Sequence, residues 1–486
     1  MKHTLSSSAL LLSIVTSIWT GMASAVENLS LPDIGDSSAT AFSQADEERF
    51  GREMMRSIRQ SGHLLEDREV EEYIQQLGYQ LVSASSRSAR EFSFFVVNEP
   101  TINAFAMPGG YIGVHSGLIS ASRNESELAG VMAHEIAHIT QRHLARRFEQ
   151  AGNMSMPMMA AVLASILLGA SNPQMGEAAL AATMAGSMQM ELDFSRAHER
   201  EADRVGMQML TGAGFDPHGM PGFFERLQQE YRYASSGLPE YLSTHPVTTD
   251  RIADARNRAE QYPRINPADD LGYRLIKTRL QVLTARNMDV LARQYRELLS
   301  TDDQRKGDAA DRYGYALALT RQHDYANSRT WLKALHQQDP GRIAYMLALA
   351  KVETEDKKLA AAEKIFLDGL KLHPNNNLLT LAYAEFLLQH GQHIKATPLL
   401  REYTRLRKVQ PKAFELLAEA ETASGNDGVA HMALADYYYG LGEIQTAVEQ
   451  LNLARQRGGL DFYYQSLLEA KLTQWKEEAA ILTPRK

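Results

Sequence analysis

A pentapeptide with two histidines, His134-Glu135-Ile136-Ala137-His138, limits what this chain can fold into more than any other stretch. It lies within residues 124–147, where apolar residues recur with the period that indicates a helix. Two histidines four apart on a helix lie about 40° apart around its axis and about 6 Å apart along it, so both imidazoles can bind one metal ion. Glu135 follows the first histidine and can accept a proton from the attacking water. The pattern is that of a zinc hydrolase, but a helix can also carry two such histidines by accident.

A second acidic stretch can supply a third ligand. Glu199-Arg200-Glu201-Ala202-Asp203 opens another helical pattern, in which Glu199 and Asp203 share a face. Glu199 can complete a site of two histidines and one glutamate and leave a fourth position open, as a catalytic zinc requires. Asp203 can hydrogen-bond a ligand histidine and fix its tautomer. Glu201 falls on another face and fits an acidic first turn that complements the helix dipole.

Both stretches resemble the metal site of the M48 metallopeptidases, which are gluzincins. The resemblance covers most of residues 45–260 and extends to residues 103–110 and to Thr244-His245-Pro246 with Arg251. It implies an α+β zincin-like metalloprotease domain. In this domain one Zn²⁺ ion is held by His134, His138 and Glu199, Glu135 is the catalytic base, and Asp203 lies behind the ligands.

The same resemblance gives expected roles to further residues. The expected substrate-binding residues are Asn103, Ala104, Phe105 and Ala106. An extended peptide can pair with the free backbone groups of such a strand edge beside the metal, although an ordinary hairpin is the alternative. His245 and Arg251 are expected to stabilise the oxyanion of the tetrahedral intermediate. Because imidazole is a good zinc ligand, His245 could instead take the open position and inhibit the enzyme.

The first 25 residues form a predicted signal peptide. They contain Lys2, an apolar run over residues 9–19, and Ala23-Ser24-Ala25 as a cleavage site with the cut after Ala25. The apolar run is too short for a membrane span. We expect the protein in the periplasm of a Gram-negative cell, although the leader equally permits full secretion. Residues 26–44 are expected to form a flexible lead-in.

Composition excludes several classes of function. The chain has no cysteine, which excludes disulfides, thiol redox chemistry and a cysteine-linked lipid anchor. Its formal net charge is −8, or −9 once Lys2 is removed with the leader. A mildly acidic chain argues against nucleic acid as a partner.

Residues 45–262 are expected to form the protease domain. Amphipathic patterns predict helices over residues 45–60 and 66–83. Runs rich in Phe and Val predict strands over 91–98, 104–106 and 111–115, and Met107-Pro108-Gly109-Gly110 predicts the turn between the last two.

The segment from residue 151 to residue 190 joins the two ligand helices and is rich in Met, Ala and Leu. It is expected to form either a helical hairpin in the core or an adaptable lid, and it is too short and too interrupted for a transmembrane helix. Two further histidines, His115 and His143, are expected to be structural or exposed. On a continuous helix, His143 would lie about 140° away from the zinc face.

Residues 263–486 are expected to form an all-α tetratricopeptide-repeat solenoid. Pro340 and Pro374 are 34 residues apart, which is the tetratricopeptide period, and Gly391 and Gly442 mark turns between helices. We expect about four units after an atypical helical pair over residues 269–299. The concave face of such an array binds peptides or proteins, and a purely structural cap on the protease is the alternative.

These patterns together predict a zinc endopeptidase whose repeats select substrates or dock the enzyme on a larger assembly. With the leader and the repeats, the family resemblance implies assembly and quality control of outer-membrane β-barrel proteins. The implied clients are unfolded or stalled barrel proteins, which offer unpaired strands, and the implied docking partner is the outer-membrane barrel assembly machinery. The alternative is a chaperone or adaptor in which cleavage is suppressed. Three features favour it: the Met-rich segment, the repeats, and the possibility that His245 blocks the open zinc position.

Overall fold

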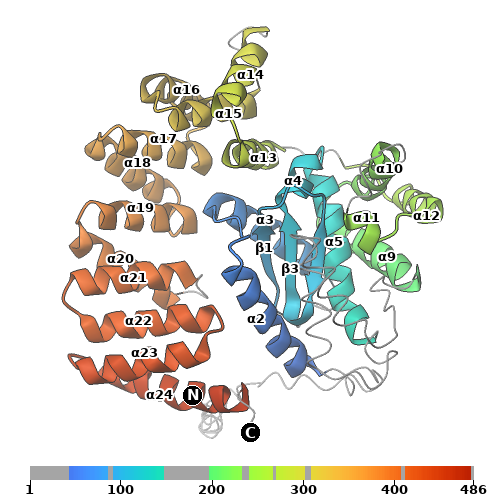
Figure 1. Cartoon of the computed structure of the whole chain (residues 1–486). Helices are drawn as coiled ribbons and strands as arrows, with labels where there is room; N and C mark the ends of the chain where they lie inside the picture. Colours follow the sequence, from blue (N-terminus) through green and yellow to red (C-terminus); the bar gives the residue numbers. More distant parts are fainter. Residues whose placement is uncertain are drawn as a thin grey trace, which may run out of the picture.

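The computed structural model (Figure 1) contains the expected α+β domain followed by helical repeats. The structure describes residues 43–85, 91–146, 196–231, 240–265, 270–301, 308–406 and 411–482. The predicted signal peptide, most of the lead-in and the Met-rich segment of residues 151–190 lie outside these ranges.

Two long helices open the protease domain, close to where the sequence predicts them. Helix α2 (Gln44–Gln60) begins after Ser43, whose hydroxyl accepts the N–H of Asp46. Helix α3 (Arg68–Ser83) begins after Asp67, whose carboxylate accepts the N–H of Val70. Such caps satisfy backbone donors that the first turn leaves free. The apolar stripe of α3 is buried against strand β1, so this helix is part of the core.

A three-stranded sheet lies beside these helices, and its strand order places β2 at one of the two edges. The strands are β1 (Ser93–Val97), β2 (Ala104–Met107) and β3 (Tyr111–His115), in the order β1-β3-β2. β3 is parallel to β1 and antiparallel to β2. The predicted strand-turn-strand is confirmed: β2 and β3 are joined by η1 (Pro108–Gly110), where Gly109 and Gly110 adopt φ values of 77° and 84° that favour glycine. β2 is thus an edge strand of this sheet.

Helix α5 (Glu125–Thr140) is the centre of the domain. It is capped by Asn124, and its residues from Ser126 to Thr140 are all buried between the sheet and helices α9 and α10. The prediction of one helix over residues 124–147 is wrong. The helix ends at Thr140 because Arg142 adopts a left-handed φ of 53°, and helical structure resumes at His143.

Five further helices complete the protease domain. They are α4 (Ser116–Ala121), α9 (Arg196–Gly212), α10 (Gly219–Tyr231), α11 (Glu240–Thr244) and α12 (Thr249–Ala259). Figure 1 shows α9 to α12 together on the side of α5 away from the repeats.

The second half of the chain is a stack of antiparallel helix pairs. Its helices are α13 (Leu271–Thr284), α14 (Met288–Thr301), α15 (Ala309–Arg321), α16 (Tyr325–Gln338), α17 (Ile343–Glu355), α18 (Leu359–Leu372), α19 (Asn377–Gln389), α20 (His393–Leu406), α21 (Pro411–Ala423), α22 (Asp427–Gly440), α23 (Ile444–Arg457) and α24 (Phe462–Leu482). Pro340 and Pro374 lie between successive pairs, and Gly391 and Gly442 take φ values of 70° and 80° in the turns. The predicted repeat architecture is confirmed.

The repeats curve around the protease domain (Figure 1), and α13 and α19 contact α3. Arg68 at the start of α3 donates two hydrogen bonds of 2.9 Å to Glu385 of α19. Arg279 of α13 donates to both oxygens of Asp67, at 2.8 and 2.7 Å, and lies 2.8 Å from Glu69. Part of the inner surface of the repeats is therefore occupied by the protease domain itself.

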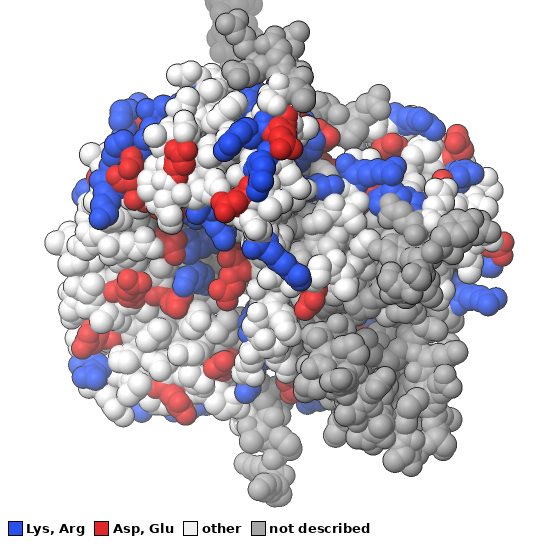
Figure 2. Space-filling model, turned by 45° about the horizontal axis from the view of Figure 1, so that its top comes forward, with Lys and Arg blue, Asp and Glu red and all other residues white. Residues whose placement is uncertain are grey.

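Charged side chains of both signs are interspersed over the face drawn in Figure 2. Within the described ranges, no helix combines the length and the apolar character that a bilayer span needs.

The ion cluster around Arg279 generates a prediction about stability. Arg279→Met leaves the carboxylates of Asp67 and Glu69 buried without their cation, so we expect the free energy of unfolding to fall by about 3–5 kcal/mol. The matched control on the same helix is Arg274→Met, because Arg274 pairs with Asp270 and Asp308 near the surface and should matter by about 1 kcal/mol or less. Thermal unfolding of the two full-length variants compares them, and equal losses would contradict a special role for the buried cluster.

Candidate metal centre

The site forms where helix α9 crosses α5 at close range. A Cβ atom added to Gly206 would lie 3.1 Å from the carbonyl carbon of Ala133 and from the nitrogen of His134. A larger residue at this position would push the helices apart. The close crossing places the Glu199 and Asp203 face of α9 against the histidines of α5.

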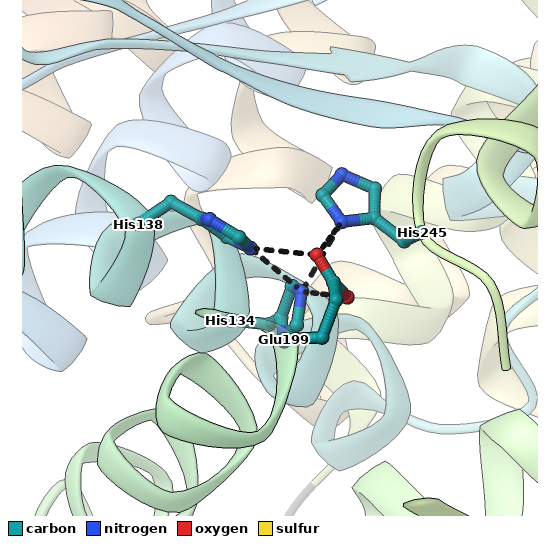
Figure 3. Close-up of side chains that lie close together, drawn as sticks. All are labelled: His134, His138, Glu199 and His245. Atoms are coloured by element: carbon teal, nitrogen blue, oxygen red, sulfur yellow. Dashed lines mark hydrogen bonds and ion pairs between the residues drawn. The ribbon is translucent and has the colours of Figure 1, made fainter. Parts of the chain in front are cut away.

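Four buried side chains converge at this crossing (Figure 3): His134, His138, Glu199 and His245. Their candidate ligand atoms all lie within 4.8 Å of one another. His134 Nε2 is 3.0 Å from His138 Nε2 and 3.4 Å from Glu199 Oε2, and His138 Nε2 is 3.5 Å from Glu199 Oε1. Two ring nitrogens that face each other so closely need a proton or a metal cation between them.

The charges of the site favour a bound cation. Burial lowers the pKa of His134, but hydrogen bonds to Asp203 and Glu199 outweigh burial and raise this pKa to about 10. For Glu199, burial raises the pKa, but the electrostatic interactions and hydrogen bonds with His245 and His134 hold it well below its usual value. The two carboxylates therefore concentrate negative charge where the imidazoles meet. Two imidazoles and a carboxylate are the donor set of catalytic zinc sites, so the residues fit that ion.

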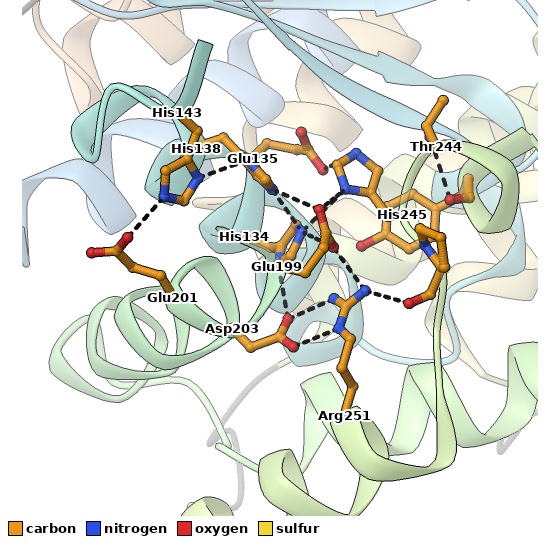
Figure 4. A network of polar contacts seen from close by, with 12 residues as sticks. His134, Glu135, His138, His143, Glu199, Glu201, Asp203, Thr244, His245 and Arg251 are labelled. Atoms are coloured by element: carbon orange, nitrogen blue, oxygen red, sulfur yellow. Dashed lines mark hydrogen bonds and ion pairs between the residues drawn. The ribbon is translucent and has the colours of Figure 1, made fainter. Parts of the chain in front are cut away.

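Asp203 and Arg251 support the ligands from behind (Figure 4). Asp203 Oδ1 lies 2.9 Å from His134 Nδ1, as expected from the sequence. Arg251 donates to both oxygens of Asp203, at 2.7 and 2.8 Å. Burial raises the pKa of Asp203, but the bonds from Arg251 and His134 outweigh burial and hold this pKa below its usual value. Asp203 is therefore an anion that orients the first ligand histidine.

Arg251 lies at the site, as a residue expected to stabilise an oxyanion, but its contacts are with carboxylates. Besides its two bonds to Asp203, its Nη1 is 2.7 Å from Glu199 Oε2 and donates to the carbonyl of Pro246 at 2.8 Å. Its guanidinium also lies over the ring of Phe224. These contacts point it at the carboxylates behind the metal ligands rather than at a place for an oxyanion.

Glu135 is fully buried beside the cluster. Neither of its oxygens has a hydrogen-bond partner among the described residues, and burial, as the chief cause, raises its pKa. A buried carboxylate without strong partners and with a raised pKa is suited to exchange protons near neutral pH. The backbone of Ala106 in β2 acts on the same pKa in the opposite direction, so the edge strand passes next to this carboxylate.

The His245 imidazole lies inside the cluster, and both of its nitrogens face groups of the site. Nδ1 is 3.0 Å from Glu199 Oε1 and 3.4 Å from His134 Nε2, while Nε2 is 3.6 Å from Glu135 Oε1 (Figure 4). Tyr241 stacks on the ring, with centroids 5.1 Å apart. His245 thus lies both among the metal-binding donors and in front of the candidate base.

The four expected substrate-binding residues lie at the edge strand or next to it. Asn103 precedes β2 and is buried, and its Oδ1 has no hydrogen-bond partner among the described residues. Ala104, Phe105 and Ala106 belong to β2, which pairs with β3 on one side. α5 packs against β2, so this strand adjoins the helix that carries both histidines.

Sequence reasoning missed two residues at the site. Tyr241 has a fully buried ring and a hydroxyl without a hydrogen-bond partner in the described part of the chain, and nothing in its sequence context marks it. His143 was expected to be structural or exposed, yet its Nδ1 lies 3.0 Å from His138 Nδ1. The break in α5 at Arg142 causes this approach, and the apolar period did not reveal that break.

The position of Arg251 generates a prediction about metal affinity. Arg251→Lys replaces a two-pronged guanidinium by a single ammonium, which cannot hold both oxygens of Asp203. We expect the affinity for a divalent metal ion to fall by about 10- to 100-fold, because groups behind the ligands have effects of this size. Arg256→Lys on the same helix is the control, since Arg256 is exposed and pairs with Glu225. Competition with a chelator measures both variants, and an unchanged affinity in Arg251→Lys would contradict this role.

Comparison with known proteins identifies the family. Residues 68–259 match Peptidase family M48, and this range contains all four residues of the metal cluster. The chain is 36% identical over 447 residues to the Beta-barrel assembly-enhancing protease of Escherichia coli (strain K12), covering 92% of this chain and 91% of that protein. It is 36% identical over 403 residues to the Putative beta-barrel assembly-enhancing protease of Vibrio cholerae serotype O1, covering 82% of each.

A mitochondrial metalloendopeptidase, OMA1 of Arabidopsis thaliana, is 36% identical over 151 residues, which are 31% of this chain and 28% of that protein. The first two alignments include most of the repeats as well as the metal site. The chain therefore belongs to peptidase family M48 and is a metalloendopeptidase.

Proposed function

We propose that the protein is a periplasmic zinc endopeptidase that takes part in the assembly and quality control of outer-membrane β-barrel proteins. One observation carries the enzymatic part: two histidines of α5 and a glutamate of α9 converge beside the buried Glu135, whose carboxylate bonds no side chain in the described part of the protein. Likeness to the β-barrel assembly-enhancing proteases over some nine-tenths of the chain supports the biological part. Export by the predicted signal peptide, with cleavage after Ala25, is part of this proposal.

His134, His138 and Glu199 would hold the zinc ion. When bound, zinc would act as a Lewis acid that lowers the pKa of the attacking water toward neutral and polarises the scissile carbonyl. Asp203 keeps His134 in the tautomer that offers Nε2 to the ion, and Arg251 holds Asp203 and Glu199 in place. The ligands thus need little rearrangement to bind the metal.

Glu135 carries the protons of the reaction. Its carboxylate accepts a proton as water attacks the peptide carbonyl and later delivers this proton to the leaving amine. Its complete burial and raised pKa suit both transfers, because the protonated form is not strongly disfavoured. The absence of bonds to other described residues leaves both oxygens available.

The edge of β2 would hold the substrate. A segment of the client adds as a further strand and pairs with the backbone of residues 103–106, which fixes its main chain regardless of its sequence. The amide oxygen of Asn103, which bonds none of the described residues, offers one more acceptor at the start of this edge. Stalled barrel proteins expose unpaired strands, so they are suited to this mode of binding.

The repeats would choose clients and dock the enzyme on the outer-membrane barrel assembly machinery. Concave surfaces of stacked helices bind extended or folded partners in this way. α13 and α19 contact α3, and Arg59 of α2 donates to the carbonyl of Leu441 at 3.1 Å, so the surface offered to a partner is the part of the repeats that these contacts leave uncovered.

His245 would keep the enzyme closed until a client binds. Its Nδ1 lies among the metal donors and its Nε2 faces Glu135, so one ring obstructs both the open coordination position and the base. This arrangement favours self-inhibition over the oxyanion role. It also supports the second candidate function, a chaperone or adaptor in which proteolysis is suppressed.

Glu135→Gln separates the enzyme from the adaptor. We expect peptide cleavage to fall by a factor of about 10² to 10⁴, while folding and zinc content stay unchanged, because only the proton acceptor is lost. Casein digestion and metal analysis of the purified full chain measure these outcomes, with chelation and zinc readdition as a control. If barrel assembly in cells remains complete with this variant, proteolysis is not the main role; if assembly fails, the adaptor function is excluded.

His245→Ala tests the closed state. If the closed form makes up about 90% of the molecules, its removal should raise cleavage about tenfold. His218→Ala is a control, since His218 directly precedes α10, pairs with Asp216 and is not one of the four residues of the metal cluster. Unchanged cleavage would argue against self-inhibition, and lost cleavage would favour the oxyanion role.

A further inference from the structure

The two ligand histidines need partners for their second nitrogens. In both rings Nε2 faces the metal cluster, so Nδ1 points away from it. A neutral imidazole that binds a metal through Nε2 carries its proton on Nδ1 and must donate it to an acceptor. For His134 this acceptor is the carboxylate of Asp203.

For His138 the neighbouring atom is another ring nitrogen. His143 Nδ1 lies 3.0 Å from His138 Nδ1, and both side chains are buried. The two nitrogens can bond only if one of them is unprotonated. Since metal binding through Nε2 leaves the proton on His138 Nδ1, His143 Nδ1 has to be the acceptor.

The other side of His143 fixes this tautomer. His143 Nε2 lies 3.2 Å from Glu201 Oε2, and a carboxylate can only accept, so Nε2 of His143 is the protonated atom. Arg146 donates to the same oxygen at 3.1 Å and holds it in place. His198 stacks on the His143 ring with centroids 4.5 Å apart and nearly parallel planes. The contacts run from Glu201 through His143 to His138 (Figure 4). Along them, each nitrogen is thereby assigned as donor or acceptor.

The backbone is shaped for this contact. α5 ends at Thr140, and Arg142 adopts a positive φ. This turn in the chain places the imidazole of His143 next to that of His138. The side chain of Arg142 pairs with Glu47 of α2 at 3.0 Å, which ties the turn to another helix. Glu201 comes from α9, two residues after the ligand Glu199, so both helices of the metal site contribute to the arrangement.

We infer that His143 is a positioning residue for the metal centre: it accepts the Nδ1 proton of His138 and, backed by Glu201, orients that ligand. The two ligand histidines then have different supports, an anion for His134 and a neutral imidazole for His138. The inference rests on the proposed zinc site and adds a residue to it.

The test compares two variants of similar size on the full chain. His143→Gln keeps an acceptor for His138, whereas His143→Leu fills the space without one. We expect the zinc dissociation constant to rise about 10- to 100-fold in His143→Leu and to stay within a few-fold of wild type in His143→Gln. Competition with a chromophoric chelator measures zinc binding, and the visible spectrum of the cobalt-substituted protein reports ligand geometry. If His143 only fills space, Leu should bind zinc as well as Gln, and this result would overturn the inference.

Two further variants serve as controls for the effect of His143 on zinc binding. Glu201→Ala removes the partly exposed end of the arrangement and should weaken zinc binding several-fold, so it decides the matter if His143→Leu does not fold; unchanged binding would count against the inference. His115→Ala deletes another buried histidine, which bonds Thr101 and is outside the cluster, and should leave zinc binding unchanged. If wild type itself binds no zinc, the proposed function fails; if wild type binds zinc and the variants match it, only the role of His143 fails.

Discussion

The structure depends on charged side chains that are buried together where helix α9 crosses helix α5. Gly206 lets α9 approach the backbone of α5, and this contact brings Glu199 and Asp203 against His134. Buried carboxylates are costly unless they are paired with cations. Arg251 supplies one cation, and a metal ion between the imidazoles and Glu199 would supply the other. The charges around the crossing thus favour a cation between the imidazoles and Glu199.

Local periodicity predicted which side chains of each helix share a face, because their spacing along a helix determines their direction. His134, His138, Glu199 and Asp203 lie where a period of 3.6 residues places them. Contacts that depend on helix ends were not predictable. The left-handed conformation of Arg142 breaks α5 without glycine or proline, and it turns His143 toward a ligand instead of away from it. Arg251 was tied to the site by family resemblance, but its pairing with two carboxylates depends on the fold.

The segment after α11 carries two residues of the site, His245 and Arg251. His245 faces the metal donors, and six residues later Arg251 holds Asp203 and Glu199 while it also bonds the carbonyl of Pro246. The repeats contact α3 and α4, and Tyr273 of α13 belongs to the same hydrophobic core as the buried side chains of α5.

The central claim is that two imidazoles of α5 and a carboxylate of α9 bind one metal ion. Elemental analysis of the purified full chain, beside the Glu199→Gln variant, tests it most directly. The account predicts close to one zinc per wild-type chain, and little or none in the folded variant after dialysis against a weak chelator. A folded wild-type protein without zinc, or a variant that retains zinc as tightly as wild type, would contradict it.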